Sequence, residues 1–120
     1  VTSFVPKSII FMQQQKRKFV KKLDYLTSPG YLDGPDGREK AGLPPGGPSV
    51  VITNMGIFRF DEKSKEMYLH STYPDIHPDQ ILAEMEFEVD CSQVREEKPP
   101  TADELMILRE KCDPHRLICN

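Results

Sequence analysis

The sequence predicts an α/β protein in which helices pack on a mixed β-sheet. Three observations predict this class. Short runs of β-branched and apolar residues recur along the chain, two of these runs read as a hairpin, and two segments carry apolar residues at helical spacing. The 120 residues match the size of one domain, so we expect residues 1–120 to form a single domain or a fragment of one.

Two strands are expected before the middle of the chain. Residues 7–12 form an apolar run bounded by Pro6 and three glutamines, which predicts a buried strand. Residues 23–27 follow a basic stretch and predict a second strand.

A Pro/Gly-rich loop covers residues 28–48. It contains five prolines and six glycines in 21 residues, and this density of restricted φ angles and missing N–H groups predicts no regular element. Loops of about 20 residues without secondary structure tend to be functional or disordered. We therefore expect this loop to be a functional segment or an arm that wraps around the domain.

Four more strands are expected after the loop. Residues 49–53 and 56–60 predict core strands, and residues 67–71 alternate as the half-buried partner of a hairpin. Residues 86–90 alternate as a final edge strand with carboxylates toward solvent.

Two helices complete the expected elements. Pro78 opens a short helix, and the capping box Thr101–Glu104 opens a C-terminal one. Spacing in the second helix predicts a buried stripe of Leu105, Leu108 and Cys112.

Composition excludes several classes of protein. The net charge of −3 argues against a protein that mainly coats nucleic acid, although residues 1–40 carry eight basic groups against four acidic ones. No run of 18 apolar residues occurs, so no membrane span is expected. Three cysteines and the absence of a signal-peptide pattern predict a reducing, cytoplasmic setting.

The basic run Lys16–Lys22 is the first candidate for chemistry. Its members Lys16, Arg17 and Lys18 are candidates to contact phosphates of a nucleotide, a nucleic acid or CoA. The alternative is a solvated connector, which is the commoner fate of charged runs.

Other reactive residue types give no defined site. Cys112, His115 and Cys119 have metal-like spacing but lack a fourth ligand nearby, so we assign no metal site. No Ser–His–Asp constellation can be placed, and nothing among the nineteen carboxylates singles out a catalytic pair.

The order of segments carries more information than any single motif. The run Lys16–Tyr31 is followed by Arg38-Glu39, Gly42-Leu43 and Gly46-Gly47-Pro48, and then by three further segments: Val50–Asp61, Met67–Ser71 and Tyr73-Pro74. As an ordered set spanning roughly residues 7–113, these segments closely resemble the B (beta) subunit of the glutaconate CoA-transferase-like group of class I CoA-transferases.

The resemblance implies the C-terminal half of an open α/β subunit that works with an A-type subunit in an oligomer. Such enzymes move CoA between carboxylic acids, with acyl-CoA as a substrate and no tightly bound cofactor. A glutamate in the N-terminal half attacks the acyl-CoA, and an anhydride then leads to a glutamyl-CoA thioester. The Glu-Asn-Gly-type segment that carries this glutamate has no counterpart here, so no catalytic residue is assigned and a missing N-terminal half is expected.

By the same resemblance, two turns are candidates to line the acyl or CoA cleft at the boundary between subunits. Their residues are Thr27, Ser28, Pro29 and Gly30 in the first turn, and Gly46 and Gly47 in the second. Two alternatives to the transferase stay open at this point: a related acyl-CoA ring-cleaving hydrolase, and a non-catalytic binding or structural module.

Overall fold

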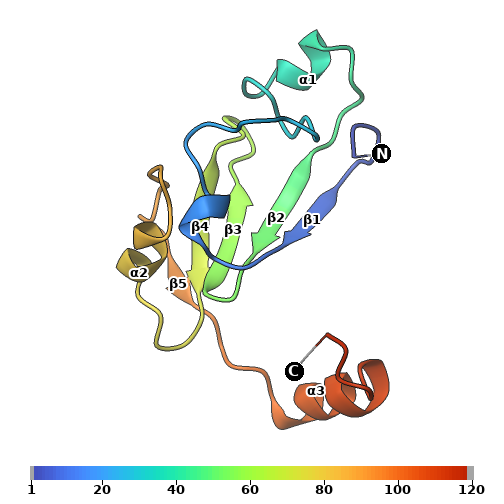
Figure 1. The fold of residues 1–120 in the computed structure, drawn as a ribbon, viewed down its shortest axis with the longest axis vertical. Coiled ribbons are helices and arrows are strands. Elements are labelled where there is room, and N and C mark those ends of the chain that lie inside the picture. The colour runs from blue at the N-terminus through green and yellow to red at the C-terminus, as the bar shows by residue number, and fades with distance from the viewer. Residues whose placement is uncertain (1, 119–120) are drawn as a thin grey trace.

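The computed structural model describes residues 2–118 and has a five-stranded sheet at its centre (Figure 1). The strands lie across the sheet in chain order: β1 (Ser8–Phe11), β2 (Pro48–Ile52), β3 (Gly56–Phe60), β4 (Met67–Thr72) and β5 (Arg95–Glu96). Parallel pairs at both edges flank an antiparallel centre, β2–β3–β4. The predicted mixed sheet is therefore confirmed.

Thr53 closes the turn that joins β2 to β3. Its hydroxyl accepts from the N–H groups of Met55 and Gly56 and donates to the Gly56 carbonyl, each at 3.1 Å. A Cβ on Gly56 would lie 2.5 Å from the carbonyl oxygen of Ser71, so β3 and β4 approach too closely here for any other residue. Local turn chemistry thus sets the register of the central strands.

The core lies where η1 (Lys16–Lys18), a short 3-10 helix, and α2 (Pro78–Ala83) meet the sheet. The ring of Phe19 packs on that of Phe58, with centroids 5.6 Å apart. The N–H of Glu86 donates to the Phe19 carbonyl at 2.8 Å, which ties the chain after η1 to the chain after α2. Six buried apolar side chains form this cluster: Phe19, Val51, Phe58, Leu69, Ile81 and Met85.

Two predicted strands are wrong. Residues 23–27 form no strand, and Leu23, Tyr25 and Leu26 are exposed because no neighbouring strand pairs with them. Residues 86–90 make only one isolated bridge, between Asp90 and Tyr68. The last strand is β5 instead, which pairs in parallel with Ser71 and Thr72 of β4.

The Pro/Gly-rich loop is mostly irregular, but it holds one helical turn, α1 (Gly37–Lys40). The expectation of no regular element there is therefore wrong. The prolines and glycines flank this turn and do not interrupt its last three residues.

β1 is an edge strand of the described sheet. The strand predicted at residues 7–12 is confirmed, but its predicted burial is wrong, because Ile9 and Phe11 are 68% and 77% exposed in the described part of the chain. β1 has a neighbour on one side only, namely β2.

The C-terminal helix begins as predicted and packs differently. The Thr101 hydroxyl accepts from the Glu104 N–H at 3.3 Å, which confirms the capping box that opens α3 (Ala102–Met106). The helix continues as a π-helical turn, η2 (Ile107–Cys112), and stands away from the sheet (Figure 1). Leu108 and Cys112 are exposed, so the predicted buried stripe is wrong. Among the described residues, no helix has the length and apolar character to cross a membrane.

Candidate functional site

A cavity of about 680 Å³ lies beside Gly46 and Gly47, the loop that precedes β2. Three other parts of the chain contribute to it: the segment before β1, the Pro/Gly-rich loop with α1, and the turn between β3 and β4. Its lining includes Pro6, Lys7, Tyr31, Arg38, Glu39 and Lys65. Two of the glycines predicted from the sequence therefore line a cavity.

The side chain of Arg38 holds this loop together. It is only 5% exposed, and its three guanidinium nitrogens donate to three backbone carbonyls. The acceptors are Pro44 at 3.1 Å, Gly30 at 2.9 Å and Ser3 at 2.7 Å. One planar cation thus fixes three separate backbone segments, a geometry that the guanidinium fork suits better than an ammonium.

Tyr31 forms one wall of the cavity. Its hydroxyl donates to the Pro48 carbonyl at 2.6 Å, its ring packs edge-on against Phe60, and the ammonium of Lys65 lies 5.7 Å from the ring centroid. A Cβ on Gly47 would lie 2.6 Å from the Tyr31 ring. Glycine is therefore required at Gly47 for the loop to reach Tyr31.

The first predicted turn, residues 27–30, directly precedes the cavity-lining Tyr31 in the sequence, but none of its residues lines the cavity. The Gly30 carbonyl accepts from the Arg38 guanidinium, so the side chain that holds Ser3 and Pro44 also holds this turn. Pro29 is half-buried, whereas Thr27 and Ser28 are exposed. The Ser28 hydroxyl accepts from that of Thr2 at 3.0 Å.

The predicted phosphate contacts lie elsewhere. Lys16, Arg17 and Lys18 form η1 and are exposed. The N–H of Lys16 donates to the Glu84 carboxylate at the end of α2, and α1 lies at the opposite end of the sheet from that helix (Figure 1). The structure therefore does not bring η1 and the Gly46–Gly47 cavity together.

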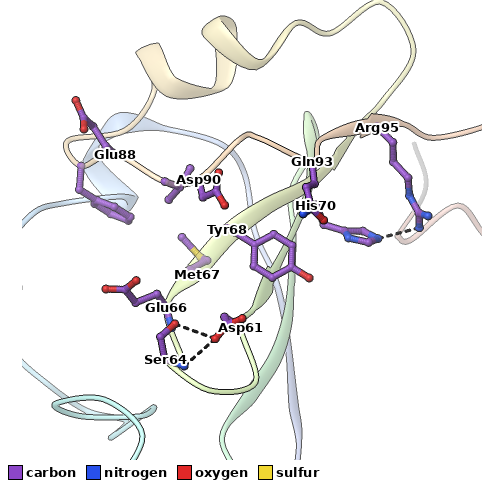
Figure 2. Close-up of a pocket in the computed structure, with 12 residues that line it drawn as sticks. Asp61, Ser64, Glu66, Met67, Tyr68, His70, Glu88, Asp90, Gln93 and Arg95 are labelled. Carbon is purple, nitrogen blue, oxygen red and sulfur yellow. Dashed lines mark hydrogen bonds between the residues drawn. The ribbon is translucent and has the colours of Figure 1, made fainter.

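A second cavity, of about 760 Å³, lies along β4 and is lined by acidic and aromatic side chains (Figure 2). Two of its carboxylates, those of Asp61 and Asp90, already accept hydrogen bonds from backbone N–H groups in turns. Asp61 accepts from the N–H groups of Ser64 and Lys63 at 2.7 and 2.9 Å, and these bonds lower the pKa of Asp61. Asp90 accepts from the Ser92 N–H, which lowers the pKa of Asp90 in the same way. Both are turn acceptors held in the charged form, which makes them weak bases.

His70 and Arg95 meet at one end of this cavity (Figure 2). Arg95 Nη2 lies 2.8 Å from His70 Nε2, and a guanidinium can only donate, so Nε2 accepts and the proton of the neutral ring sits on Nδ1. Burial lowers the pKa of His70, and the charges of Arg95 and Arg59 lower it further. The sequence offered no signal for this pair, because only the pairing of Ser71 with Arg95 brings together residues 25 positions apart.

A metal centre finds no support in residues 2–118, where no three His, Cys, Asp or Glu side chains are grouped to hold an ion. Cys119 of the predicted Cys112, His115, Cys119 spacing lies outside the described residues.

Comparison with known proteins identifies a family that this chain resembles. A family model described as coenzyme A transferase matches residues 5–84. The B subunit of glutaconate CoA-transferase from Acidaminococcus fermentans is 46% identical over 108 residues, a match that covers 89% of this chain and 41% of that protein. The cholesterol ring-cleaving hydrolase IpdB subunit of Mycobacterium tuberculosis is 30% identical over 110 residues, which cover 85% of this chain and 40% of that one.

A solved structure shows the same fold. The crystal structure of glutaconate coenzyme A-transferase from A. fermentans superposes with a TM-score of 0.92 at 42% identity, covering 98% of this chain and 46% of that chain. The chain therefore spans about two fifths of the length of the curated relatives it matches. The family match extends from before β1 to the end of α2, and so includes Arg38 and the Gly46–Gly47 loop. This chain belongs to the coenzyme A transferase family.

Proposed function

We propose that these residues form the C-terminal half of a B-type subunit of a CoA-transferase, which moves CoA between carboxylic acids. In the proposed reaction a glutamate outside these residues attacks the acyl-CoA and releases the CoA thiolate. The thiolate then opens the resulting anhydride at the glutamyl carbonyl, which gives a glutamyl-CoA thioester and releases the first carboxylic acid. A carboxylic acid then takes over the CoA by the reverse steps. CoA is a substrate here, and no tightly bound cofactor takes part.

One observation carries the proposal: 46% identity to the B subunit of a glutaconate CoA-transferase over 108 residues, together with a superposition that covers nearly the whole chain. The relative is named as a B subunit, which supports an A-type subunit as partner in a hetero-oligomer. A cytoplasmic setting is part of the proposal and rests on the low cysteine count. In this proposal the nucleophile lies outside these residues, because the Glu-Asn-Gly-type segment expected to carry it has no counterpart in the sequence.

The site residues take supporting roles in this proposal. Gly46 and Gly47 line the cleft toward the acyl or CoA substrate, since they form the wall of a cavity already held open by Arg38. The turn of Thr27, Ser28, Pro29 and Gly30 lies at the boundary between subunits, and the exposed Lys16, Arg17 and Lys18 offer charge to the phosphates of CoA.

A ring-cleaving acyl-CoA hydrolase is the second candidate, favoured by the 30% identity to the IpdB subunit. The two candidates differ in the second substrate that reacts. In a transferase a carboxylic acid accepts the CoA and the first acid is released, whereas a hydrolase uses water.

Co-expression of the complete protein that contains these residues with an A-type subunit tests both candidates. A transferase should convert an acyl-CoA plus a free carboxylic acid into the new acyl-CoA, and should gain the mass of CoA when incubated with acyl-CoA alone. Ring opening without an acceptor acid would favour the hydrolase. A panel of acyl-CoA esters left unchanged by the purified complex would contradict both and favour a non-catalytic module.

A further inference from the structure

The buried guanidinium of Arg38 has no carboxylate partner among residues 2–118. Its bonds run to three carbonyl oxygens, and the structure records no ion pair for it in that range. Burying a charge costs free energy unless it is compensated, and carbonyl dipoles compensate a full charge only in part. Three of the five guanidinium N–H donors are used, so two remain for another acceptor.

The cavity beside Arg38 is basic. Lys7 and Lys65 also line it, while Glu39 is the one carboxylate among its lining residues. The lining therefore carries a net charge of about +2, and phosphate carries about −1.5 to −2 near neutral pH. A monocarboxylate would leave half of this charge uncompensated.

The cavity also has the size and the walls of a binding site. Its volume of about 680 Å³ falls within the range of small-molecule pockets, about 300–1,000 Å³. Its walls are held in place by the Arg38 bonds and by the Tyr31 hydroxyl bond to the Pro48 carbonyl. Such a prearranged pocket needs little ordering when a ligand enters.

We propose that this cavity is a phosphate-binding site, in which Lys7, Lys65 and the remaining donors of Arg38 hold a phosphate dianion. The site lies where β1 and β2 begin, since Lys7 precedes β1 and Gly47 precedes β2.

In open α/β sheets the reacting groups bind outside the carboxyl ends of the parallel strands. For β1 and β2 these ends lie at the other end of the strands from the cavity. The phosphate therefore lies away from the reacting thioester. It is either free inorganic phosphate or a phosphate of CoA, and the second case rests on the proposed function: Gly46 and Gly47 then line the CoA part of the cleft, and a different phosphate of CoA faces Lys16–Lys18.

The test measures binding of inorganic phosphate to the complete protein by isothermal titration calorimetry. The variant is Lys7→Gln with Lys65→Gln, and the matched control is Lys40→Gln with Lys63→Gln. The control removes two exposed lysines from α1 and from the same β3–β4 turn, and neither lines the cavity. We expect the first pair to weaken phosphate binding by about tenfold or more and the control pair by less than about twofold.

A competition arm identifies the source of the phosphate. Displacement of bound phosphate by CoA assigns the site to a phosphate of CoA, and binding that CoA leaves intact assigns it to free phosphate. The site is overturned if the wild-type protein binds no phosphate, or if both lysine pairs lose binding equally. None of these readouts needs CoA-transfer activity, so the site can stand or fall independently of the proposed reaction.

Discussion

Arg38 Nη2 donates to the carbonyl oxygen of Ser3 at 2.7 Å, a bond that joins the start of the chain to a helical turn 35 residues later. The same side chain also holds Gly30 and Pro44. Three stretches of irregular backbone therefore depend on one buried cation, and this dependence leads to the first prediction.

Replacement of Arg38 by Met should lower the free energy of unfolding by about 3 kcal/mol, because three carbonyls lose donors that carry charge. Arg38→Lys should recover part of this loss, since an ammonium reaches fewer of the three acceptors. Urea unfolding of the variants measures both effects. Arg109→Met, an exposed replacement in η2, is the control and should change stability by less than about 0.5 kcal/mol. An Arg38→Met protein as stable as the wild type would show that the carbonyls find other donors.

Gly47→Ala should be more damaging than Gly30→Ala. Both glycines have positive φ, at +134° and +56°, but only a Cβ on Gly47 would meet another group, the Tyr31 ring at 2.6 Å. Gly30→Ala should cost about 1 kcal/mol for its left-handed backbone alone. Gly47→Ala adds the displacement of Tyr31 to backbone strain of about 1–3 kcal/mol. Thermal unfolding compares the two, and equal losses would mean that Tyr31 moves aside freely.

Acid should destabilise the protein partly through Asp61. The N–H groups of Ser64 and Lys63 and the Ser64 hydroxyl lower the pKa of Asp61 below its ordinary value. A lowered folded-state pKa contributes stability that is present above the unfolded pKa, near pH 4, and is lost as the pH falls through the folded value. Asp61→Asn should therefore flatten the loss of stability below about pH 4. Unfolding midpoints measured between pH 2.5 and pH 6, with exposed Glu62→Gln as the control, test this. Parallel curves for Asp61→Asn and the wild type would contradict it.

Arg95→Gln should raise the pKa of His70. Burial is the main cause of the low pKa of this ring, followed by the charge of Arg95 and then that of Arg59, so the value should rise but stay below the ordinary one. Because the pKa is lowered on folding, its stabilising effect is present above the unfolded value and is lost as the pH falls through the folded value. Imidazole chemical shifts followed against pH measure the change. Lys98→Gln removes an exposed positive charge without touching the ring and should leave the titration in place. An identical shift in both variants would assign the effect to net charge.

The elements that the sequence predicts well are those whose signal is local. The strands at residues 49–53, 56–60 and 67–71 were found from β-branched and alternating residues, and turn chemistry at Thr53 and Asp61 reinforces them. The helix at Pro78 is predicted because proline, which has no N–H, suits the first position of a helix. The capping box at Thr101 is predicted because the N–H groups at a helix start need nearby acceptors. Each of these signals depends on neighbours a few residues away.

The wrong predictions share a different cause. The segments 23–27 and 86–90 have residues suited to a strand, yet a strand also needs a neighbour to pair with. For residues 86–90 that neighbour would be β4, which pairs with Arg95–Glu96 instead. β1 and the C-terminal helix have apolar residues that are exposed in residues 2–118. Hydrophobic periodicity predicts that one face will be buried, but it does not identify the segment that packs against that face.

By itself, the sequence determined the family and the mixed sheet, since both follow from residue order and local patterns, and it singled out Gly46 and Gly47 as candidates. Only the tertiary structure decided which side chains surround those glycines. Lys7, Arg38 and Lys65 are distant in the chain, and they line one cavity because β1 lies parallel beside β2 and the β3–β4 turn folds back over Tyr31. Charges gathered by strand pairing leave no local pattern, and the most basic run in the sequence, Lys16–Lys22, lies outside that cavity.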